Sequence, residues 1–378
     1  MSVDLSIVIV NFNTAHFLFP LMDSILNQEW SIDGRPGTCE VIVVDNASKG
    51  EDAAMVLPLK KQGMHYIQNT MNVGYGQANN QGFAVATGRY HMILNPDCCF
   101  LPGCFQALID HLETHPGSTM VGPLAFMDPE ATCMMPPNEM PTPELFEFQT
   151  RAQVETDCAT QNLVQRTKFA YEYWAAKEPL EMEMLSGSCL VFRRSLFADE
   201  HPFDPGFPLY YEDTDMFMRL RRAGKKLMHI PTARMLHYWS QSADGHARGA
   251  EYRHQISANR YYLKHFGEAG VETYRSNLAL SLEYRERGQH VSPFEFQEIE
   301  AGAEPPTFHV AEGHENFFVE FAGNPIFTLA VGMFPTEPSS FTVSPVMWQQ
   351  IGPGNYWIRI IDCDTLQTVH AWVITKKP

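Results

Sequence analysis

Short apolar runs, each followed at once by polar side chains, constrain the fold of this chain more than any other feature. Residues 5–10 and 41–44 are rich in β-branched side chains, which is typical of strands buried on both faces of a parallel sheet. Residues 90–94 form a third run. Parallel neighbours need crossover connections, so we expect helices between these strands.

Two segments have the spacing of such helices. Leu18, Leu21 and Ile25 recur at helical intervals after Thr14, a residue type that caps helices. Residues 105–112 carry apolar side chains at i, i+3, i+4 and i+7 between two Pro-Gly pairs. The first ~120 residues therefore predict an open, doubly wound α/β domain, whose ligand lies at the carboxyl ends of the strands.

Polar side chains stand where each predicted strand ends. Asn11 and Asn13 follow the first run, Asp45 ends the second, and Asn95 and Asp97 follow the third. Strand ends in such a sheet meet at one edge, so we expect these residues to converge.

Residues 72–80 read as a loop with a Gly-x-Gly pair at Gly74 and Gly76, among Asn72 and Asn79. The third glycine of a dinucleotide fingerprint is missing, and the loop does not follow the first strand, which disfavours a dehydrogenase. A turn with positive φ is the alternative interpretation.

The composition excludes several classes of protein. Lys and Arg total 27 against 44 Asp and Glu, and a net charge of −17 would repel nucleic acid. With 44% apolar and 19% charged residues, the chain is expected to fold rather than to be disordered. We expect neither a signal peptide nor a transmembrane segment, and the eight cysteines, without a CxxC pair, predict reduced thiols in a cytoplasmic protein.

Three carboxylates, Glu212, Asp213 and Asp215, fall just before a predicted helix that ends at Gly224. Acids at a helix N-terminus are stabilised by about 0.3–1 kcal/mol, which alone could explain them. An ionised carboxylate beside a sugar site is also what a general base requires.

The ordered set of motifs from about residue 5 to 240 resembles the family 2 glycosyltransferases, inverting enzymes with the nucleotide-sugar-binding α/β fold called GT-A. The Asn-Pro-Asp motif at 95–97 and the asparagine-rich loop look most like the rhamnosyltransferase-like branch. The segments that carry the resemblance are 7–13, 43–48, 72–80, 94–97, 186–188, Glu212 with Asp213, and His237 with Ser242.

The resemblance implies a role for each matched position. Asp45 would bind the pyrimidine ring of the donor, since a carboxylate facing the ring N–H selects uracil or thymine. Asp97 and His237 would hold Mn²⁺ or Mg²⁺, although Asn95 replaces the first acid of the family's metal motif. The other positions predicted to bind the nucleotide sugar are Asn11, Asn13, Asn72, Gly76, Asn79, Asn95 and Gly187.

Asp213 falls on the family's catalytic base, Glu212 on a neighbour that contacts the acceptor, and Asp215 is the second choice for the base. The implied reaction is a single displacement: the base deprotonates an acceptor hydroxyl, which attacks the anomeric carbon as the nucleoside diphosphate leaves. The configuration at that carbon inverts.

The later chain carries weaker signals. Residues 132–184 are interpreted as an acceptor-side insertion and 252–287 as trailing helices, while 301–306 resemble a linker. A period of two then predicts a small antiparallel β-sandwich. The predicted domains are a GT-A catalytic domain at 1–250, a helical extension with linker at 251–300, and the β-sandwich at 301–378.

Aromatic side chains leave alternatives open. The stripe formed by Phe169, Tyr173 and Trp174 either stacks on sugar rings or belongs to a core. The basic-aromatic cluster at 260–265 either touches a lipid-linked acceptor or forms a solvated face. The tryptophans of the β-module fit a carbohydrate-binding face, core packing or a dimer contact: Trp348, Trp357 and Trp372.

The sequence thus predicts a metal-dependent inverting glycosyltransferase that moves a sugar from a UDP or dTDP donor to a glycan or lipid-linked glycan. The prediction places it in the cytoplasm and leaves open a peripheral position at the inner face of the membrane, and a homo-oligomer. A nucleotidyltransferase would share the fold but needs a basic, Gly-rich N-terminal loop. A non-catalytic sugar-binding protein would need inert acidic sites.

Overall fold

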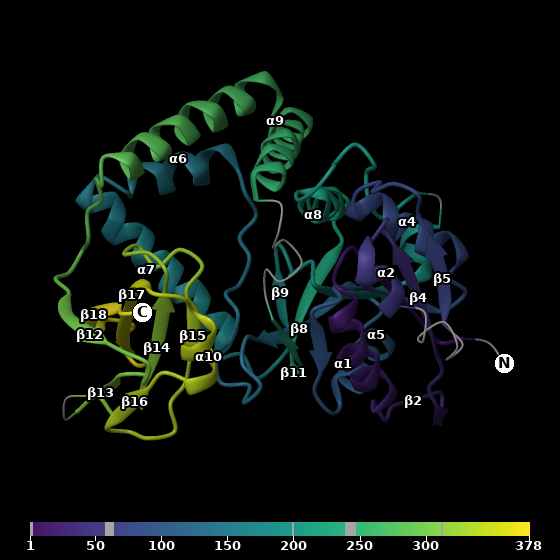
Figure 1. The fold of residues 1–378 in the computed structure, drawn as a ribbon, viewed down its shortest axis with the longest axis horizontal. Coiled ribbons are helices and arrows are strands. Elements are labelled where there is room, and N and C mark those ends of the chain that lie inside the picture. Colours follow the sequence, from purple (N-terminus) through teal and green to yellow (C-terminus); the bar gives the residue numbers. More distant parts are fainter. Residues whose placement is uncertain (1–2, 57–63, 199, 239–246, 311–312) are drawn as a thin grey trace. The chain divides into compact units, whose positions relative to one another are not determined.

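The computed structural model describes residues 3–56, 64–198, 200–238, 247–310 and 313–378 (Figure 1). They form two compact units that interleave along the sequence. The first unit comprises Met1–Ala125, Asn138–Met140 and Ala176–His265, and the second comprises Phe126–Pro137, Pro141–Ala175 and Phe266–Pro378.

A nine-stranded mixed sheet forms the centre of the first unit, in the order β5-β4-β1-β6-β10-β8-β11-β7 with β9 paired to β11. From β5 to β6 neighbouring strands are parallel, and β10 runs antiparallel to β6. The strands are β1 (Leu5–Asn11), β4 (Cys39–Asp45), β5 (His65–Gln68), β6 (Tyr90–Leu94), β7 (Cys98–Phe100), β8 (Ser118–Phe126), β9 (Leu180–Met182), β10 (Cys189–Arg193) and β11 (Lys226–His237). A small hairpin, β2 (Ser31–Ile32) with β3 (Arg35–Pro36), stands apart.

Helices connect these strands as the sequence predicts, which confirms the α/β class. The two helices expected from apolar spacing are α1 (Ala15–Leu26) and α5 (Cys104–Thr114). The others in this unit are α2 (Gly50–Met55), α4 (Tyr75–Val85), the 3-10 helix η1 (Arg194–Phe197), α8 (Glu212–Arg222) and the first part of α9 (Ala247–Glu286), which is interrupted at Gly267 with a φ of 70°. The α4 helix approaches the sheet closely, because a Cβ on Gly82 would lie 2.4 Å from Val8 Cγ1.

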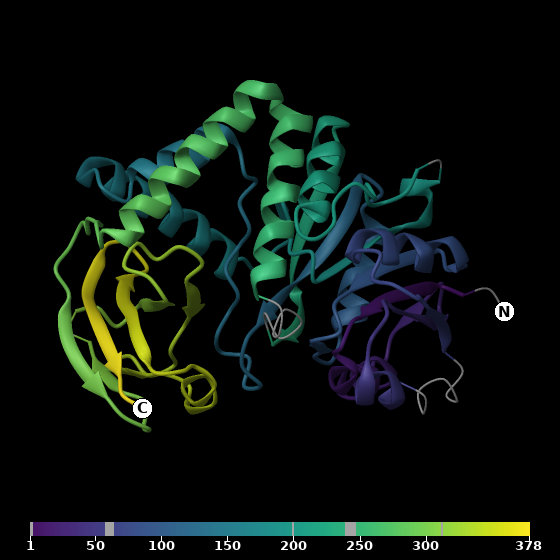
Figure 2. The same ribbon diagram turned by 45° about the horizontal axis from the view of Figure 1, so that its top comes forward.

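The second unit contains the predicted C-terminal antiparallel sheet, in the order β12-β18-β17-β14-β15, with β12 added in parallel (Figure 2). The β13–β16 pair packs on one face, where Phe308 and Phe341 share a core with Trp348 and Trp372. The elements are β12 (Gln297–Ala301), β13 (Thr307–His309), β14 (Phe317–Ala322), β15 (Val331–Met333), β16 (Ser340–Thr342), β17 (Gly354–Asp362), β18 (Thr368–Lys376), α6 (Pro143–Arg151), α7 (Thr156–Trp174) and α10 (Pro345–Gln350).

The α7 helix packs on the other face of this sheet, so the units do not follow the predicted boundaries at 250 and 300. The rings of Tyr171 and Trp174 pack against Phe318 of β14 in tilted and edge-on arrangements, and Trp174 Nε1 donates to Met135 O at 2.8 Å. Much of the stretch interpreted as an acceptor-side insertion therefore forms the core of the second unit. A sequence pattern does not reveal which sheet a helix will cover.

Three of the four tryptophans considered for sugar binding are buried in this unit. Trp174, Trp348 and Trp372 are at most 8% exposed, and Trp357 is partly buried beside Phe327. Core packing is therefore the correct alternative for Trp174, Trp348 and Trp372, and these three rings cannot present a carbohydrate-binding face.

A buried ion cluster joins α7 to the sheet. Glu320 is fully buried, its Oε2 accepts from Arg359 Nε at 2.7 Å, and Arg166 also pairs with it. Arg359 is 1% exposed and stands over the Phe327 ring. Removing one charge from such a cluster leaves the others buried and uncompensated.

We expect Glu320→Gln to lower the free energy of unfolding of the second unit by about 3–5 kcal/mol, because it leaves two guanidinium groups without a counter-charge. Glu300→Gln is the matched control: Glu300 is 73% exposed in its pair with Lys377, so the loss should stay below about 1 kcal/mol. Urea unfolding followed by tryptophan fluorescence measures both. If both variants lower the free energy of unfolding by the same small amount, the buried ion cluster contributes little to stability.

Within the part of the chain that the structure describes, no helix is both long and apolar enough to cross a membrane.

Candidate active site

The carboxyl ends of β1 and β4 bring Asn11 and Asp45 side by side, since these residues are in register. Asn11 Nδ2 donates to Asp45 Oδ2 at 2.8 Å and to Asp52 Oδ2 at 3.1 Å. Asp45 Oδ1 accepts from Ser48 N and from Gln68 Nε2, both at 2.8 Å. The Tyr66 side chain is also hydrogen-bonded to Asp45, so the four or so acceptor positions of this buried carboxylate are all in use.

Two further predicted asparagines shape the neighbouring loops. Asn13 has a φ of 58°, and its Oδ1 accepts from Lys49 N at 2.9 Å. Asn72 Oδ1 accepts from Gly74 N at 2.9 Å and from Asn46 Nδ2 at 3.0 Å. Gly74 has a φ of 91°, as the turn interpretation expects. These bonds fix the loops after β1 and β5 at the same edge of the sheet.

Residues 75–80 are helical rather than a loop, because α4 begins at Tyr75. Gly76 lies inside this helix, where a Cβ would stand 3.0 Å from Phe203 Cβ, so its small size has a packing reason. Asn79 is fully buried, and its Nδ2 donates to Tyr75 O at 3.0 Å, while its Oδ1 has no hydrogen-bond partner.

Asp97, Cys98 and His237 form a buried cluster, in which one ligand atom of each lies within 4.8 Å of the others. The Nε2 of His237 is 3.5 Å from Asp97 Oδ1. Neither Asp97 Oδ1 nor His237 Nδ1 has a hydrogen-bond partner. Buried polar atoms are normally satisfied, so this donor set fits a divalent ion. The sequence analysis predicts Asp97 and His237 as ligands and does not include Cys98, which the structure places beside them.

Asn95 stands close to this cluster, but its side chain is already engaged. Its Oδ1 accepts the Tyr75 hydroxyl at 2.8 Å, and its backbone N donates to Ser188 O at 2.8 Å. The Tyr75 hydroxyl thus uses one of the two lone pairs of the amide oxygen at the position where the family has an acid. Ser242, the last residue of the resemblance, lies outside the described residues.

The acid pair Glu212 and Asp213 begins α8, after two residues in the left-handed region. Tyr210 and Tyr211 each have a φ of 63°, a costly conformation that concentrates at functional sites. Glu212 is 6% exposed and its Oε2 has no partner. Burial, with the Asp213 charge, raises the pKa of Glu212 to about 8, and burial also raises the pKa of Asp213. Glu212 therefore holds its proton near neutral pH, and Asp213 is the member of the pair that is left to accept one.

Gly187, in the loop before β10, makes room for this pair. A Cβ on Gly187 would lie 2.3 Å from Asp213 Oδ2 and 3.1 Å from its Cγ. The small residue in this loop therefore lets the Asp213 carboxylate rest against the backbone. This is the physical reason for the Ser-Gly-Ser pattern at 186–188.

We expect Gly187→Ala to reduce sugar transfer by roughly 10–100-fold, because the methyl group displaces Asp213 and misplaced catalytic groups lose that much. The melting temperature should change little. Gly117→Ala is the control, since a Cβ there meets nothing within 4 Å. Unchanged transfer by Gly187→Ala would show that the position of Asp213 is unimportant.

A second test uses the raised pKa of Glu212. The folded protein holds this proton more tightly than the unfolded chain does. The proton therefore stabilises the fold fully below pH 4.5, and this stabilisation is lost as the pH rises to about 8. Glu212→Gln imitates the protonated acid, so its melting temperature should fall less than that of the wild type over this range. Parallel melting curves at every pH would contradict the raised pKa.

Asp215 is buried and fully ion-paired. Its Oδ1 lies 2.7 Å from both Lys264 Nζ and His265 Nε2, and its Oδ2 accepts from Arg219 Nε at 3.0 Å. Burial acts to raise the pKa of Asp215, but the hydrogen bonds from His265 and Lys264 together outweigh it and lower that pKa. These partners occupy the carboxylate, so the geometry favours Asp213 over Asp215 as a base.

The basic-aromatic cluster of α9 is largely packed against the loop that precedes the acid pair. Tyr261 and Tyr262 are buried, and Arg260 pairs with Asp204 at 2.9 Å and stands 5.3 Å above the Phe207 ring. Arg260 and Lys264 stay 43% and 32% exposed, so a solvated face describes only part of the cluster, and its contact with a lipid-linked acceptor stays a prediction.

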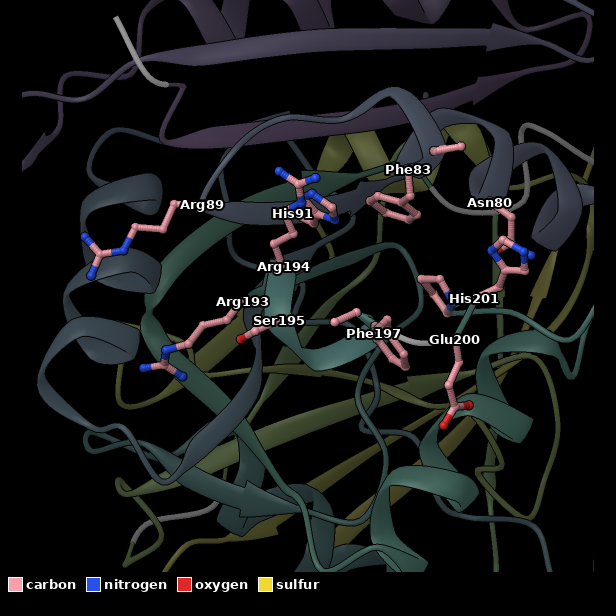
Figure 3. A pocket seen from close by; sticks show the side chains of 13 residues that line it. Asn80, Phe83, Arg89, His91, Arg193, Arg194, Ser195, Phe197, Glu200 and His201 are labelled. Atoms are coloured by element: carbon pink, nitrogen blue, oxygen red, sulfur yellow. The ribbon is translucent and has the colours of Figure 1, made fainter.

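A cavity of about 850 Å³ lies elsewhere in the first unit (Figure 3). Arg89, His91 and Arg194 line it, at the amino end of β6 and the end of β10 that pairs with it. None of the predicted site residues lines it, because they stand at the carboxyl ends of the parallel strands. The chemistry of the strand ends, rather than the volume of this cavity, therefore locates the candidate site.

Polar residues at the strand ends, an acid pair at a helix start and a metal-type cluster make up the candidate site of the first unit. The family model for glycosyl transferase family 2 matches residues 6–199, just over half of the chain. The chain belongs to this family and is a glycosyltransferase.

Relatives agree with the rhamnosyltransferase-like resemblance. The chain is 28% identical over 223 residues to the N-acetylglucosaminyl-diphospho-decaprenol L-rhamnosyltransferase of Mycobacterium tuberculosis, which covers 53% of this chain and 67% of that protein. It is 25% identical over 224 residues to the low-salt glycan biosynthesis hexosyltransferase Agl10 of Haloferax volcanii, covering 58% and 62%.

Solved structures similar to this one include the mannosyltransferase PcManGT from Pyrobaculum calidifontis, with a TM-score of 0.44, 15% identity and coverage of 76% and 80% of the two chains. TarS of S. aureus has a TM-score of 0.45, 13% identity and coverage of 75% and 74%.

Proposed function

We propose that this glycosyltransferase moves a sugar from a pyrimidine nucleoside diphosphate donor to a hydroxyl group of a lipid-linked glycan, with inversion and with a divalent ion. The observation that carries the proposal is the 186–188 loop, which links both chemical groups. Gly187 contacts the Asp213 carboxylate, and Ser188 O accepts from Asn95 N and from the Cys98 thiol at 3.8 Å. The proposed base and the metal-type cluster thus both contact the 186–188 loop.

Asp213 is the proposed general base. Its Oδ1 accepts from Thr214 N at 2.7 Å, which orients the carboxylate and leaves Oδ2 facing Gly187. A base with a raised pKa removes a proton from an acceptor hydroxyl more readily near neutral pH than an ordinary aspartate does. Glu212, buried beside it, is proposed to contact the acceptor.

Asp97 and His237 are the residues that would hold the ion. When bound, a divalent ion supplies positive charge that stabilises the departing diphosphate. Asp97 is held for this task by its backbone, since its carbonyl accepts from Tyr238 N at 3.0 Å. One set of residues would deprotonate the acceptor and another would stabilise the leaving group. The reaction then needs only a single displacement, which inverts the anomeric configuration.

Asp45 is proposed to bind the pyrimidine ring, because a carboxylate can accept a hydrogen bond from a ring N–H that replaces one of its present donors. A thermal-shift panel of uridine, thymidine and guanosine diphosphate sugars with Mn²⁺ tests this, since ligands of the native state raise the melting temperature. We expect the pyrimidine donors to give the larger shift. A larger shift with the guanosine donor would remove the assignment.

The proposed acceptor follows from the relative in M. tuberculosis, whose name states a decaprenol-linked diphosphosugar acceptor. A lipid-linked acceptor would place the enzyme at the inner face of a membrane. Transfer of a radiolabelled sugar to a polyprenyl diphosphate saccharide, compared with the same saccharide without the lipid, tests this part. Equal transfer to both would show that the lipid is not recognised.

A further inference from the structure

We propose that the Cys98 sulfur is a third protein ligand of the divalent ion, so that the site prefers a transition metal ion such as Mn²⁺, Co²⁺ or Zn²⁺ to Mg²⁺. This inference rests on the proposed metal-dependent function and deepens it. It concerns the one group of at least three candidate ligand residues found among the described residues.

Strand pairing places the thiol beside the imidazole. β7 and β11 are antiparallel, and Cys98 stands directly opposite His237. Side chains at directly opposed positions lie on the same face of a sheet, with Cβ atoms about 4.5–5.5 Å apart. Asp97, the preceding residue, completes a set whose ligand atoms all lie within 4.8 Å of one another.

The set is compact enough for a small ion. Bonds of about 2.0–2.3 Å to nitrogen, oxygen and sulfur place tetrahedral ligand atoms roughly 3.3–3.8 Å apart. His237 Nε2 and Asp97 Oδ1 are already 3.5 Å apart, so side-chain rotations of Cys98 and its neighbours close the remaining gap.

The neighbouring polar atoms leave this position open. Asp97 Oδ1, which faces His237 Nε2, has no hydrogen-bond partner, although the Asp97 side chain is only 2% exposed. The Cys98 thiol makes only a weak 3.8 Å contact with Ser188 O, which a metal bond would outweigh.

Asn95 does not supply the missing ligand. Its amide oxygen accepts from the Tyr75 hydroxyl at 2.8 Å, which uses one of two lone pairs, and an amide does not bring the charge that an acid at this position would. Cys98 restores that charge, because a thiol that binds a metal does so as a thiolate and its proton passes to the solvent.

The ligand type decides the preferred ion. Mg²⁺ prefers oxygen ligands in octahedral geometry and is a poor partner for sulfur. Imidazole and thiolate together suit first-row transition ions, with affinity rising from Mn²⁺ to Co²⁺. The site is therefore expected to bind Co²⁺ or Zn²⁺ more tightly than Mg²⁺.

Absorption spectroscopy of the full-length protein titrated with Co²⁺, with and without UDP, tests the inference. A thiolate bound to Co²⁺ gives a strong charge-transfer band in the near ultraviolet, which oxygen and nitrogen ligands do not. We expect the wild type and Cys99→Ser to show the band. Cys98→Ser should lose it and bind Co²⁺ at least about tenfold more weakly, the lower limit for losing even an outer-shell partner.

The outcomes separate the two proposals. Co²⁺ binding without the band, and unchanged by Cys98→Ser, overturns the Cys98 assignment while leaving Asp97 and His237 as ligands. No Co²⁺ binding even with UDP overturns the metal dependence as well. If Cys98→Ser fails to fold, X-ray absorption of the Zn²⁺-loaded wild type decides, since a sulfur neighbour at about 2.3 Å is required.

Discussion

Replacing Asp213 by Asn is expected to reduce sugar transfer by about 100-fold or more, within the usual range for loss of a general base. The amide keeps the size of the side chain and can still accept from Thr214 N, but it cannot take a proton. Donor binding should survive, because Asp213 does not belong to the Asn11–Asp45 network. Initial rates, donor affinity and melting temperature are measured on the same preparation.

Asp215→Asn is the matched comparison, two residues along the same helix. Asp215 is ion-paired with Lys264, His265 and Arg219, so its loss should lower the melting temperature strongly. If Asp213 only stabilises the start of α8, Asp213→Asn should cost about 1 kcal/mol or less and leave transfer near normal. A near-normal rate would therefore falsify its role as the base.

Asp97→Ala is expected to abolish stimulation by divalent ions and to weaken nucleoside diphosphate binding by about tenfold or more, because it deletes the only carboxylate of the cluster. His237→Ala should show a smaller loss of the same kind. Isothermal titration of UDP with and without Mn²⁺ separates ion-dependent binding from the rest. The Asp97 assignment fails if the variant keeps full stimulation by Mn²⁺ while folded.

The part of the site at the sheet edge could be predicted from sequence, because the carboxyl end of each parallel strand lies at the same edge of the sheet. Asn11 and Asp45 end apolar runs, and their parallel register brings them together as expected. Glu212 and Asp213 stand at a helix start that apolar spacing reveals. Each of these inferences depends only on local pattern and on the rule that parallel strands end at one edge.

Contacts between distant segments could not be predicted in this way. Cys98 became a candidate ligand only when β11, over a hundred residues later, placed His237 opposite it. From sequence, Gly187 resembles a turn residue and Gly76 a glycine of a binding loop. The structure shows that Gly187 lies against Asp213 and that Gly76 lies against Phe203. Asp215 looks like a possible base in sequence, whereas Lys264 and His265 of α9 occupy it.

The division of the chain into two units could not be predicted from sequence either. The α7 helix carries Arg166, which pairs with Glu320 of β14, and Thr167, whose hydroxyl accepts from Arg359 of β17, more than 150 residues later. A helix with an apolar face can cover any sheet that offers a matching surface. For this reason the stretch interpreted as an acceptor-side insertion belongs largely to the second unit.

Product analysis of the purified enzyme with a pyrimidine nucleoside diphosphate sugar, Mn²⁺ and a lipid-linked saccharide tests the central proposal most directly. We expect release of the nucleoside diphosphate in step with acceptor glycosylation, an inverted anomeric configuration in the product by NMR, and neither in Asp213→Asn. Release of pyrophosphate would instead indicate nucleotidyl transfer, and retention of the donor configuration would contradict the single displacement by Asp213.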